Sequence, residues 1–294
     1  MAAVPPSIGQ YFFASIAWVV FTVSRHHRHV IRVNLDIAFP EISESERRRV
    51  VWGMCLSVGR LVVDICRLPR LGDSWMESHI DIPKRDELRA LVQRSPHGVL
   101  LASAHVGSFE MLGQLLAHHI APLSVVAREF SDAAVHRFWN GRRVLRGNEV
   151  INRRGGVRGI LRALGRGRMV GILMDQNVTR NNAVFAPFFG VPAATTSAVA
   201  MVALRTGTPI VVATVVNLPE DRYAVVWEEC AYDDFKDGPR GASSVAVAHL
   251  TARLNALIES RIRKDPTQWF WMHRRWRTTV EEGGRSVYGN GQGA

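Results

Sequence analysis

The chain has 294 residues, of which 47% are hydrophobic, so it can bury a core in one large domain or two small ones. Its 37 basic and 26 acidic side chains give a net charge of +11, which indicates anionic partners such as phospholipid surfaces, phosphorylated glycolipids, an acidic carrier protein or nucleic acid. The cysteines Cys55, Cys66 and Cys230 form no close pair, which excludes a disulfide framework and fits a reducing, cytosolic-side location.

An apolar run near the N-terminus, residues 11–23 (YFFASIAWVVFTV), predicts a membrane anchor. The run is shorter than the roughly 20 residues that a span usually needs, so we expect it to cross a thinned bilayer or to lie in the interface. Basic residues follow it at once, at Arg25, Arg28 and Arg32, and none precedes it. By the positive-inside rule, the bulk of the chain then stays cytoplasmic. A buried core helix is the alternative for this segment.

Beyond the anchor, predicted strands and helices alternate. A helix is expected over 44–67, with Ser43 or Ser45 as its N-cap. Short apolar runs predict strands at 98–105, 123–128, 169–175, 209–216 and 223–228. Helical periodicity predicts helices at 109–119, 131–146, 157–165, 196–206 and 242–263. This alternation predicts an α/β fold whose mixed or mostly parallel sheet is flanked by helices on both faces.

The expected domain organisation is simple. Residues 1–30 form the N-terminal membrane anchor, and residues 31–280 form one α/β domain without internal repeats. The tail, residues 281–294, is polar and rich in glycine, so we expect it to be disordered.

A histidine and a carboxylate flank the end of the first of these strands. His105 ends the apolar run GVLLASAH, and Glu110 follows five residues later in the first turn of the next predicted helix. On one continuous helix, residues five apart point about 140° apart, so the break at Gly107 and Ser108 lets the two side chains converge. A carboxylate on one imidazole nitrogen would fix the tautomer and leave the other nitrogen as a general base for a hydroxyl. A structural, hydrogen-bonded histidine is the alternative.

Two further charged residues stand at carboxyl ends of predicted strands, where open α/β sheets bind ligands. Arg128 is a candidate to bind a glycolipid or pantetheine phosphate, or to stabilise charge at the site; a surface ion pair with Glu129 is the alternative. Asp175, in the segment MDQN, is a candidate to hold Arg128 or to order the site; a turn or helix cap is the alternative.

The segment VFAPFFGVPAATT (184–196) predicts a turn crowded with phenylalanines, with at least one ring outside the core of a helix or strand. Phe188 and Phe189 are candidates to line an apolar tunnel for an acyl chain. Each buried methylene of such a chain would contribute about 0.8 kcal/mol, so a tunnel could bind the chain and measure its length. Rings that simply pack beneath the domain are the alternative.

Basic residues concentrate in two places. Residues 137–168 contain ten arginines and a single acidic residue, Glu149. Four of the arginines recur every four residues and predict a basic amphipathic helix: Arg154, Arg158, Arg162 and Arg166. The segment HRRWR (273–277) is a second cluster, in which Arg274 and Arg275 are candidates to bind glycolipid phosphates or headgroups.

No metal site is predicted. The adjacent His118 and His119 have no partner carboxylate at ligand spacing in the sequence. The double glycine at 155 and 156 lacks the surrounding pattern of a phosphate-binding loop.

Four separated segments resemble one family in type and order. The His-x4-Glu motif of residues 105–110 resembles the His-x4-Asp/Glu motif of glycerolipid-type acyltransferases. The segments ILMDQN (172–177), VFAPFFGVPAATT and WFWMHRRWRT (269–278) look like the bacterial lipid A (lauroyl or myristoyl) acyltransferase family, within the lysophospholipid acyltransferase-like superfamily. An early NLDIAFPE (34–41) is similar to the N-terminal part of that family. The resemblance covers nearly the whole chain.

The resemblance implies transfer of a fatty acyl chain from acyl carrier protein, or acyl-CoA, to a hydroxyl of a membrane glycolipid, expected to be a lipid A precursor. The enzyme is expected at the cytoplasmic face of the inner membrane, without a cofactor and without nucleic acid as a partner. His105 would deprotonate the hydroxyl while Glu110 holds and polarises His105, and no covalent acyl-enzyme is required. Arg128 or backbone N–H groups near Gly107 are candidates to bind the oxyanion.

Two departures from the family's pattern leave the acceptor open. Phe109 stands where the family often has a tryptophan, and VTRNNAV (178–184) replaces a glycine-bearing link after the DQ pair. Another glycolipid, such as an inositol mannoside, or a lysophospholipid is therefore an alternative acceptor. A glycerol-phosphate acyltransferase is disfavoured because its F-P-E-G-T-R type motif is absent. A non-enzymatic protein that binds anionic lipid would explain the arginines but not His105 and Glu110.

Overall fold

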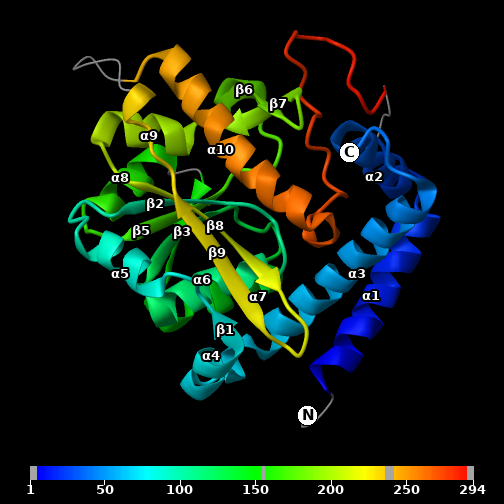
Figure 1. Ribbon diagram of the computed structural model, residues 1–294, viewed down its shortest axis with the longest axis horizontal. Coiled ribbons are helices and arrows are strands. Elements are labelled where there is room, and N and C mark those ends of the chain that lie inside the picture. Colours follow the sequence, from blue (N-terminus) through cyan, green and yellow to red (C-terminus); the bar gives the residue numbers. More distant parts are fainter. Residues whose placement is uncertain (1–4, 154–155, 236–241, 290–294) are drawn as a thin grey trace.

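The computed structural model describes residues 5–153, 156–235 and 242–289, which form an α/β fold around a seven-stranded sheet (Figure 1). The strand order is β1-β9-β8-β2-β5-β3-β4. The pairs from β8 to β4 are parallel, whereas β9 runs antiparallel to β8. The strands of this sheet are β1 (Ile80–Asp81), β2 (Val99–Ser103), β3 (Leu123–Ala127), β4 (Glu149–Asn152), β5 (Met169–Leu173), β8 (Ile210–Asn217) and β9 (Tyr223–Glu229). The predicted mixed or mostly parallel sheet is confirmed.

Helices cover both faces of the sheet, as predicted (Figure 1). The helices are α1 (Pro6–Val23), α2 (Arg25–Ala38), α3 (Glu44–Arg67), α4 (Asp73–His79), α5 (Arg85–Gln93), α6 (Phe109–His119), α7 (Ala133–Arg143), α8 (Gly156–Leu164), α9 (Ala198–Thr206) and α10 (Ser244–Lys264). Successive side chains of a strand point to opposite faces. In β2, Leu100 and Ala102 pack with α8, α9 and α10, whereas Val99 and Leu101 pack with α4, α5 and α6. The sheet is thus buried on both sides.

The N-terminal helix α1 lies along α3 at the outer edge of the molecule (Figure 1). Its inner side, Ala14, Ala17 and Phe21, is buried. The two helices approach so closely that a Cβ atom on Gly59 would lie 2.2 Å from the carbonyl oxygen of Gln10, so the crossing requires glycine there. The outer side of α1 remains apolar and exposed. Among the described residues, α1 is the helix with the length and composition to cross a membrane.

Several boundaries differ from the sequence predictions. Helix α3 begins as predicted, because Ser43 forms a capping box with Glu46. The helix α2 crosses the expected domain boundary at residue 30 and continues to Ala38. Helices α2, α4 and α5 and the short edge strands β1 and β4 were not predicted.

Two segments expected to be irregular are ordered. The segment that contains Phe188 forms a β-hairpin, β6 (Ala183–Phe188) and β7 (Val191–Thr196), instead of a turn alone. In the tail that was expected to be disordered, Tyr288 is buried and its hydroxyl donates to Oδ1 of Asn34 at 2.5 Å. This single aromatic residue fixes an otherwise polar segment. Residues 290–294 lie outside the described part of the chain.

Candidate active site

The carboxyl edge of the parallel strands brings His105 and Asp175 together. Strands β2 and β5 are neighbours, and Ser103 lies opposite Leu173 at their ends. His105 and Asp175 each follow two residues later, so they occupy equivalent positions beyond two adjacent strands. This is the edge at which open α/β sheets bind ligands.

Asp175 holds His105 through both oxygens. Its Oδ1 lies 2.8 Å from Nδ1 of His105, and its Oδ2 accepts the backbone N–H of His105 at 2.8 Å. The indole Nε1 of Trp269 donates to the same Oδ2 at 2.7 Å. Burial of the carboxyl opposes its ionisation, but the charge and hydrogen bonds of His105 and the hydrogen bond of Trp269 outweigh burial and lower the pKa of Asp175 to about 2. Asp175 is therefore a carboxylate at neutral pH.

The second ring nitrogen of His105 is the one available for chemistry. With a proton on Nδ1 donated to Asp175, Nε2 carries a lone pair. The amide Nε2 of Gln176 lies 3.0 Å from it and can donate to it. The ring edge also meets Phe109, with centroids 4.6 Å apart. The His105 side chain is 14% exposed, so a substrate hydroxyl can replace the Gln176 amide at Nε2.

The loop from His105 to Ser108 is tied to the body of the protein at every residue. Val106 forms a β-bridge with Trp269, and the N–H of Gly107 donates to the carbonyl of Gln268 at 2.9 Å. Gly107 has a φ of +57°, and a Cβ atom there would lie 2.4 Å from a backbone oxygen of β8, so the turn requires glycine. The loop is thereby preorganised before any substrate binds.

Ser108, the last residue before α6, is held by a buried polar network. Its hydroxyl donates to Oδ2 of Asp64 on α3 at 2.5 Å, and its N–H donates to Oδ1 of Asn217 at 3.1 Å. Asp64 also accepts from the hydroxyl of Tyr223 at 2.6 Å and from Arg67. Burial raises the pKa of Asp64, while Arg67 and the hydrogen bonds to Ser108 and Tyr223 oppose that rise. The network fixes the start of α6 against α3.

Glu110 faces an arginine. Its carboxylate forms a two-point ion pair with Arg143 of α7, through Nη2 and through Nε at 3.0 Å. The expectation that Glu110 reaches an imidazole nitrogen of His105 differs from this geometry, because the first turn of α6 directs the carboxylate toward α7. Both side chains are largely buried, and Nη1 of Arg143 is buried without a hydrogen-bond partner among the described residues.

Arg128 lies directly after β3, at the same edge of the sheet, and is exposed. Among the described residues it makes no hydrogen bond or ion pair, so Glu129 does not neutralise it, and neither does Asp175. It is free to meet an anion.

Phe188 and Phe189 belong to the core. Phe188 is fully buried against Trp269 and Trp276, and Phe189 packs on Trp271. The structure therefore gives neither ring a free face toward an acyl chain. Phe189 lies in the turn of this hairpin and has a φ of +51°. Phe185, in the same segment, is only half-buried, as expected for at least one of its rings.

The two arginines of the C-terminal cluster have different surroundings. Arg275 is fully buried: its Nη1 donates to the carbonyl of Ala194 at 2.9 Å, and its Nη2 donates to the hydroxyl of Thr195 at 2.6 Å. Burial lowers its pKa to about 10. Its predicted role as a headgroup ligand does not fit a guanidinium without solvent access; it instead secures β7. Arg274 lies near His26 of α2, 3.1 Å from its Nε2.

The basic helix is α8, and its charged side faces solvent. Arg158 and Arg162 are exposed, whereas Arg166 pairs with Glu149. Arg154 lies outside the described residues. Ile160 and Leu164 are buried on the other side of the helix, whereas Leu161 is 41% exposed.

A carboxylate does accompany His118 and His119, contrary to the sequence reading. Glu77 of α4 lies 3.0 Å from Nε2 of His118 and 3.7 Å from Nδ1 of His119. A guanidinium nitrogen of Arg146 lies 3.3 Å from Nδ1 of His118, and one of Arg85 lies 3.3 Å from Nδ1 of His119. Burial lowers the pKa of His119. The sequence missed this cluster because Glu77 comes from a distant helix, and arginines already supply its positive charge.

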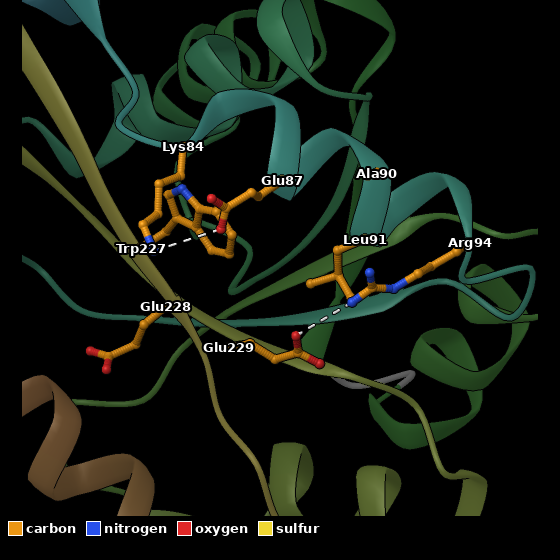
Figure 2. A pocket seen from close by; sticks show the side chains of 8 residues that line it. All are labelled: Lys84, Glu87, Ala90, Leu91, Arg94, Trp227, Glu228 and Glu229. Carbon is orange, nitrogen blue, oxygen red and sulfur yellow. Dashed lines mark ion pairs between the residues drawn. The ribbon is translucent and has the colours of Figure 1, made fainter.

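A groove of about 390 Å3 lies between α5 and β9 (Figure 2). Two ion pairs lie within it: Lys84 lies 3.7 Å from Glu87, and Arg94 lies 3.7 Å from Glu229. Glu228, which also lines the groove, pairs with Arg261 outside it. Glu229 is opposite Val211 at the start of β8, so the groove is at the amino edge of the parallel strands. It is thus at the opposite edge from His105.

Comparison with known proteins identifies the family. The profile of the bacterial lipid A biosynthesis acyltransferase family matches residues 1–278. The chain belongs to this family. It is 27% identical to the lipid A biosynthesis acyltransferase of Haemophilus influenzae over 273 residues, which are 90% of this chain and 82% of the relative. It is also 27% identical to the palmitoleoyltransferase and the lauroyltransferase of lipid A biosynthesis in Escherichia coli, in each case over 86% of this chain and about 80% of the relative.

Membership confirms the resemblance found in the sequence and the prediction of an acyltransferase. Several residues around His105 were not singled out from the sequence: Asp64, Arg143, Gln176, Asn217 and Trp269. Gln176 could have been found because it follows Asp175 directly. Asp64 and Arg143 come from distant helices, so only the tertiary fold brings them to the motif.

Proposed function

We propose that this lipid A acyltransferase family member transfers a fatty acyl chain from acyl carrier protein to a hydroxyl of a membrane glycolipid, with His105 as general base. The observation that carries the proposal is the pair of Asp175 and Nδ1 of His105 at 2.8 Å, which leaves Nε2 as a proton acceptor at a partly exposed position. Acyl-CoA is the alternative donor, because either carrier presents a thioester.

The proposed reaction is a direct transfer. Nε2 of His105 takes the proton of the acceptor hydroxyl as its oxygen attacks the thioester carbonyl, and Asp175 stabilises the imidazolium that forms. The tetrahedral intermediate then collapses: the C–S bond breaks, and the departing thiolate takes the proton from the imidazolium. The products are an ester and a free carrier thiol, and the ring returns to its starting state. The chain's own residues suffice for every proton in this scheme.

The role of Glu110 is revised in this proposal. Glu110 positions Arg143 through their two-point ion pair, and Asp175 takes the orienting role first assigned to Glu110. The unpartnered, buried Nη1 of Arg143 is a candidate donor for a negative charge of the substrate or the intermediate. The N–H of Gly107 is a poor oxyanion donor, since Gln268 already accepts it. Arg128, exposed and free of partners among the described residues, is a second candidate for a substrate phosphate.

A lipid A precursor is the favoured acceptor, because the relatives that cover most of this chain carry lipid A biosynthesis in their names. Phe109, which replaces the tryptophan often found before the acid, contacts both His105 and Phe270. A change at this position alters the surface next to Nε2. Another glycolipid, such as an inositol mannoside, or a lysophospholipid is therefore the alternative acceptor.

The proposed location is the cytoplasmic face of the inner membrane. Tyr11, Phe12 and Val19 on the outer side of α1 are each more than half exposed, at 57%, 61% and 56%. Arginines at the start of α2 follow directly, which suits anionic headgroups on the cytoplasmic side. Helix α1 fits an anchor by composition and by this exposed side.

The test is transfer of labelled lauroyl or myristoyl chains from acyl carrier protein by detergent-solubilised protein. The acceptors are a tetra-acylated, Kdo-bearing lipid A precursor, an inositol mannoside and a lysophospholipid, offered separately. Transfer to the first supports the favoured acceptor, and transfer to another keeps the chemistry and changes the acceptor. The non-enzymatic lipid-binding alternative predicts a different result. No acceptor would be acylated, and the protein would bind anionic vesicles in a way that salt abolishes and that His105→Ala leaves intact.

A further inference from the structure

Helix α7 is hydrogen-bonded to the rest of the protein through its last turn. None of its residues, from Ala133 to Arg143, is buried. Nε of Arg142 donates to the carbonyl of Ile65 on α3 at 2.8 Å, and Arg143 forms the ion pair with Glu110. Nε2 of Gln114 donates to the carbonyls of Arg142 and Arg143 at 3.1 and 3.0 Å. Among the described residues, the first two turns of α7 make no hydrogen bond or ion pair to another element, although α7 also contacts β4 and Nδ1 of His136 is buried.

The first two turns of α7 present apolar side chains to solvent. The exposed fractions are 41% for Val135, 39% for Phe138, 38% for the preceding Phe130 and 46% for the following Val144. Val135, Phe138 and Arg142 are spaced at i, i+3 and i+7, so they share one side of the helix. The guanidinium of Arg142 lies 3.4 Å from the centre of the Phe138 ring. Phe130 stacks on Trp139, which lies on this side of the helix, so we call Phe130, Val135 and Phe138 the α7 apolar face.

Such a helix is poorly suited to water alone. An isolated helix of this length is marginally stable in water, and most helices gain their stability by burying an apolar side. Complete burial of one large apolar side chain contributes about 1.5–3 kcal/mol. The α7 apolar face therefore indicates an occupant that covers it during function.

The charges around this face indicate an anionic occupant. Arg128 and Arg137 are exposed and make no hydrogen bond or ion pair with other described residues. Of the two acids near the start of the helix, Asp132 accepts the N–H groups of Ala134 and Val135 and is thus engaged as the helix cap, and Glu129 beside Arg128 is exposed. An apolar side flanked by arginines is the pattern of helices that lie in the headgroup region of a membrane.

The last turn of α7 and the N-terminal half of α1 both contact the C-terminal half of α3. Arg142 of α7 contacts α3 at Ile65, and α1 crosses α3 at Gly59. These two points on α3 are six residues apart, which is about 9 Å along a helix. Both helices thus reach the same end of α3, which favours one extended lipid surface over a separate protein partner for α7.

We propose that α7 is a second membrane-contacting helix. Its apolar face enters the boundary between headgroups and acyl chains of an anionic bilayer, and Arg128 and Arg137 bind lipid phosphates. Because Arg143 on the same helix holds Glu110 at the start of α6, this contact places the entrance to His105 at the lipid surface. The inference does not depend on which hydroxyl accepts the acyl group.

The first experiment measures insertion directly. The full chain with Cys66→Ser loses its exposed cysteine, while Cys55 and Cys230 remain buried. Val135→Cys or Val245→Cys then carries an environment-sensitive fluorophore; both valines are exposed and lie in the first turn of a helix, α7 or α10. The probes are vesicles of phosphatidylglycerol and phosphatidylethanolamine with a doxyl quencher in the acyl chain. We expect quenching of at least about twofold at position 135, as for a group about 5–10 Å deep, and none at position 245.

A lack of quenching at position 135 would overturn the proposal, most clearly if a label at Ile16→Cys on α1 is quenched in the same vesicles. Equal quenching at 135 and 245 would overturn it as well, because the contact would then not be specific to α7. A response at position 135 to acyl carrier protein but not to vesicles would assign the face to a protein partner instead. None of these readouts requires catalysis, so they stand apart from a failure of the proposed function.

A second experiment tests the consequence for activity. Phe138→Asp should lower transfer to an acceptor embedded in vesicles by about tenfold, which corresponds to about 1.4 kcal/mol, and leave transfer to the same acceptor in detergent within about twofold. Val245→Asp is the matched control and should change neither rate. Equal losses in vesicles and detergent for Phe138→Asp would contradict a membrane role for this face.

Discussion

Asp175→Asn tests whether Asp175 orients His105. The carboxylate lies 2.8 Å from Nδ1 of the ring, and at an effective dielectric constant of about 20 its attraction for an imidazolium at that distance is about 6 kcal/mol. A carboxamide keeps the shape but removes the charge, and its amide nitrogen can only donate toward Nδ1. The ring would then carry its proton on Nε2, where the base is needed. We expect kcat to fall by about 10^4, the size of the corresponding loss in a Ser-His-Asp triad.

The assay is single-turnover transfer of a labelled acyl chain from acyl carrier protein to a lipid acceptor, with thermal unfolding measured in parallel. Glu110→Gln is the matched variant, because it makes the same chemical change at the carboxylate that faces Arg143. Its transfer rate should stay at least about tenfold above that of Asp175→Asn. The reasoning is refuted if Asp175→Asn keeps its rate within about tenfold of the wild type, or if Glu110→Gln is the slower of the two folded variants.

Further predictions concern stability. Arg143→Met should destabilise the fold by about 3–5 kcal/mol, because it leaves the Glu110 carboxylate buried and unpaired. In thermal unfolding, the double variant Glu110→Gln/Arg143→Met should regain most of the lost stability. If the stability losses of the two single changes simply add in the double variant, the ion pair is contradicted. Phe188→Ala should lower the free energy of unfolding by about 3–5 kcal/mol in denaturant, since the ring is fully buried. If the variant instead keeps its stability and prefers acyl chains of another length, the ring lines a tunnel after all. Burial lowers the pKa of His273 from 6.5 to about 4, and its Nε2 accepts the N–H of Asn177. Between these pH values the unfolded chain therefore binds a proton that the folded chain does not, so the free energy of unfolding should rise with pH by up to about 3 kcal/mol. His273→Gln should flatten this rise when unfolding is measured across the same pH range. An unchanged slope would refute the assignment to His273.

The architecture of the sheet could be predicted from the sequence because its strands are short apolar runs. In β2, buried on both faces, every side chain is apolar or small, and the helix α6 that follows has clear periodicity. The edge strands β1 and β4 escaped prediction because they are only two and four residues long and partly exposed. The positions of His105 and Asp175 at strand ends followed from the same pattern.

The partners within the site could not be read from spacing along the chain. Glu110 is close to His105 in sequence, but the turn of α6 directs it to Arg143, which comes from another helix. Asp175 reaches His105 because β2 and β5 are neighbours, and strand order is a tertiary property. The C-terminal cluster shows the same limit: Arg275 was expected at the surface by its charge, yet it is buried in hydrogen bonds to β7.

The most direct test of the account is the transfer rate of His105→Ala under single-turnover conditions, with wild-type protein beside it and acyl carrier protein as donor. The account predicts a fall of at least about a hundredfold, the usual scale for loss of a general base, in a protein that unfolds at a similar temperature and still associates with vesicles. A rate within about tenfold of the wild type would contradict His105 as the base.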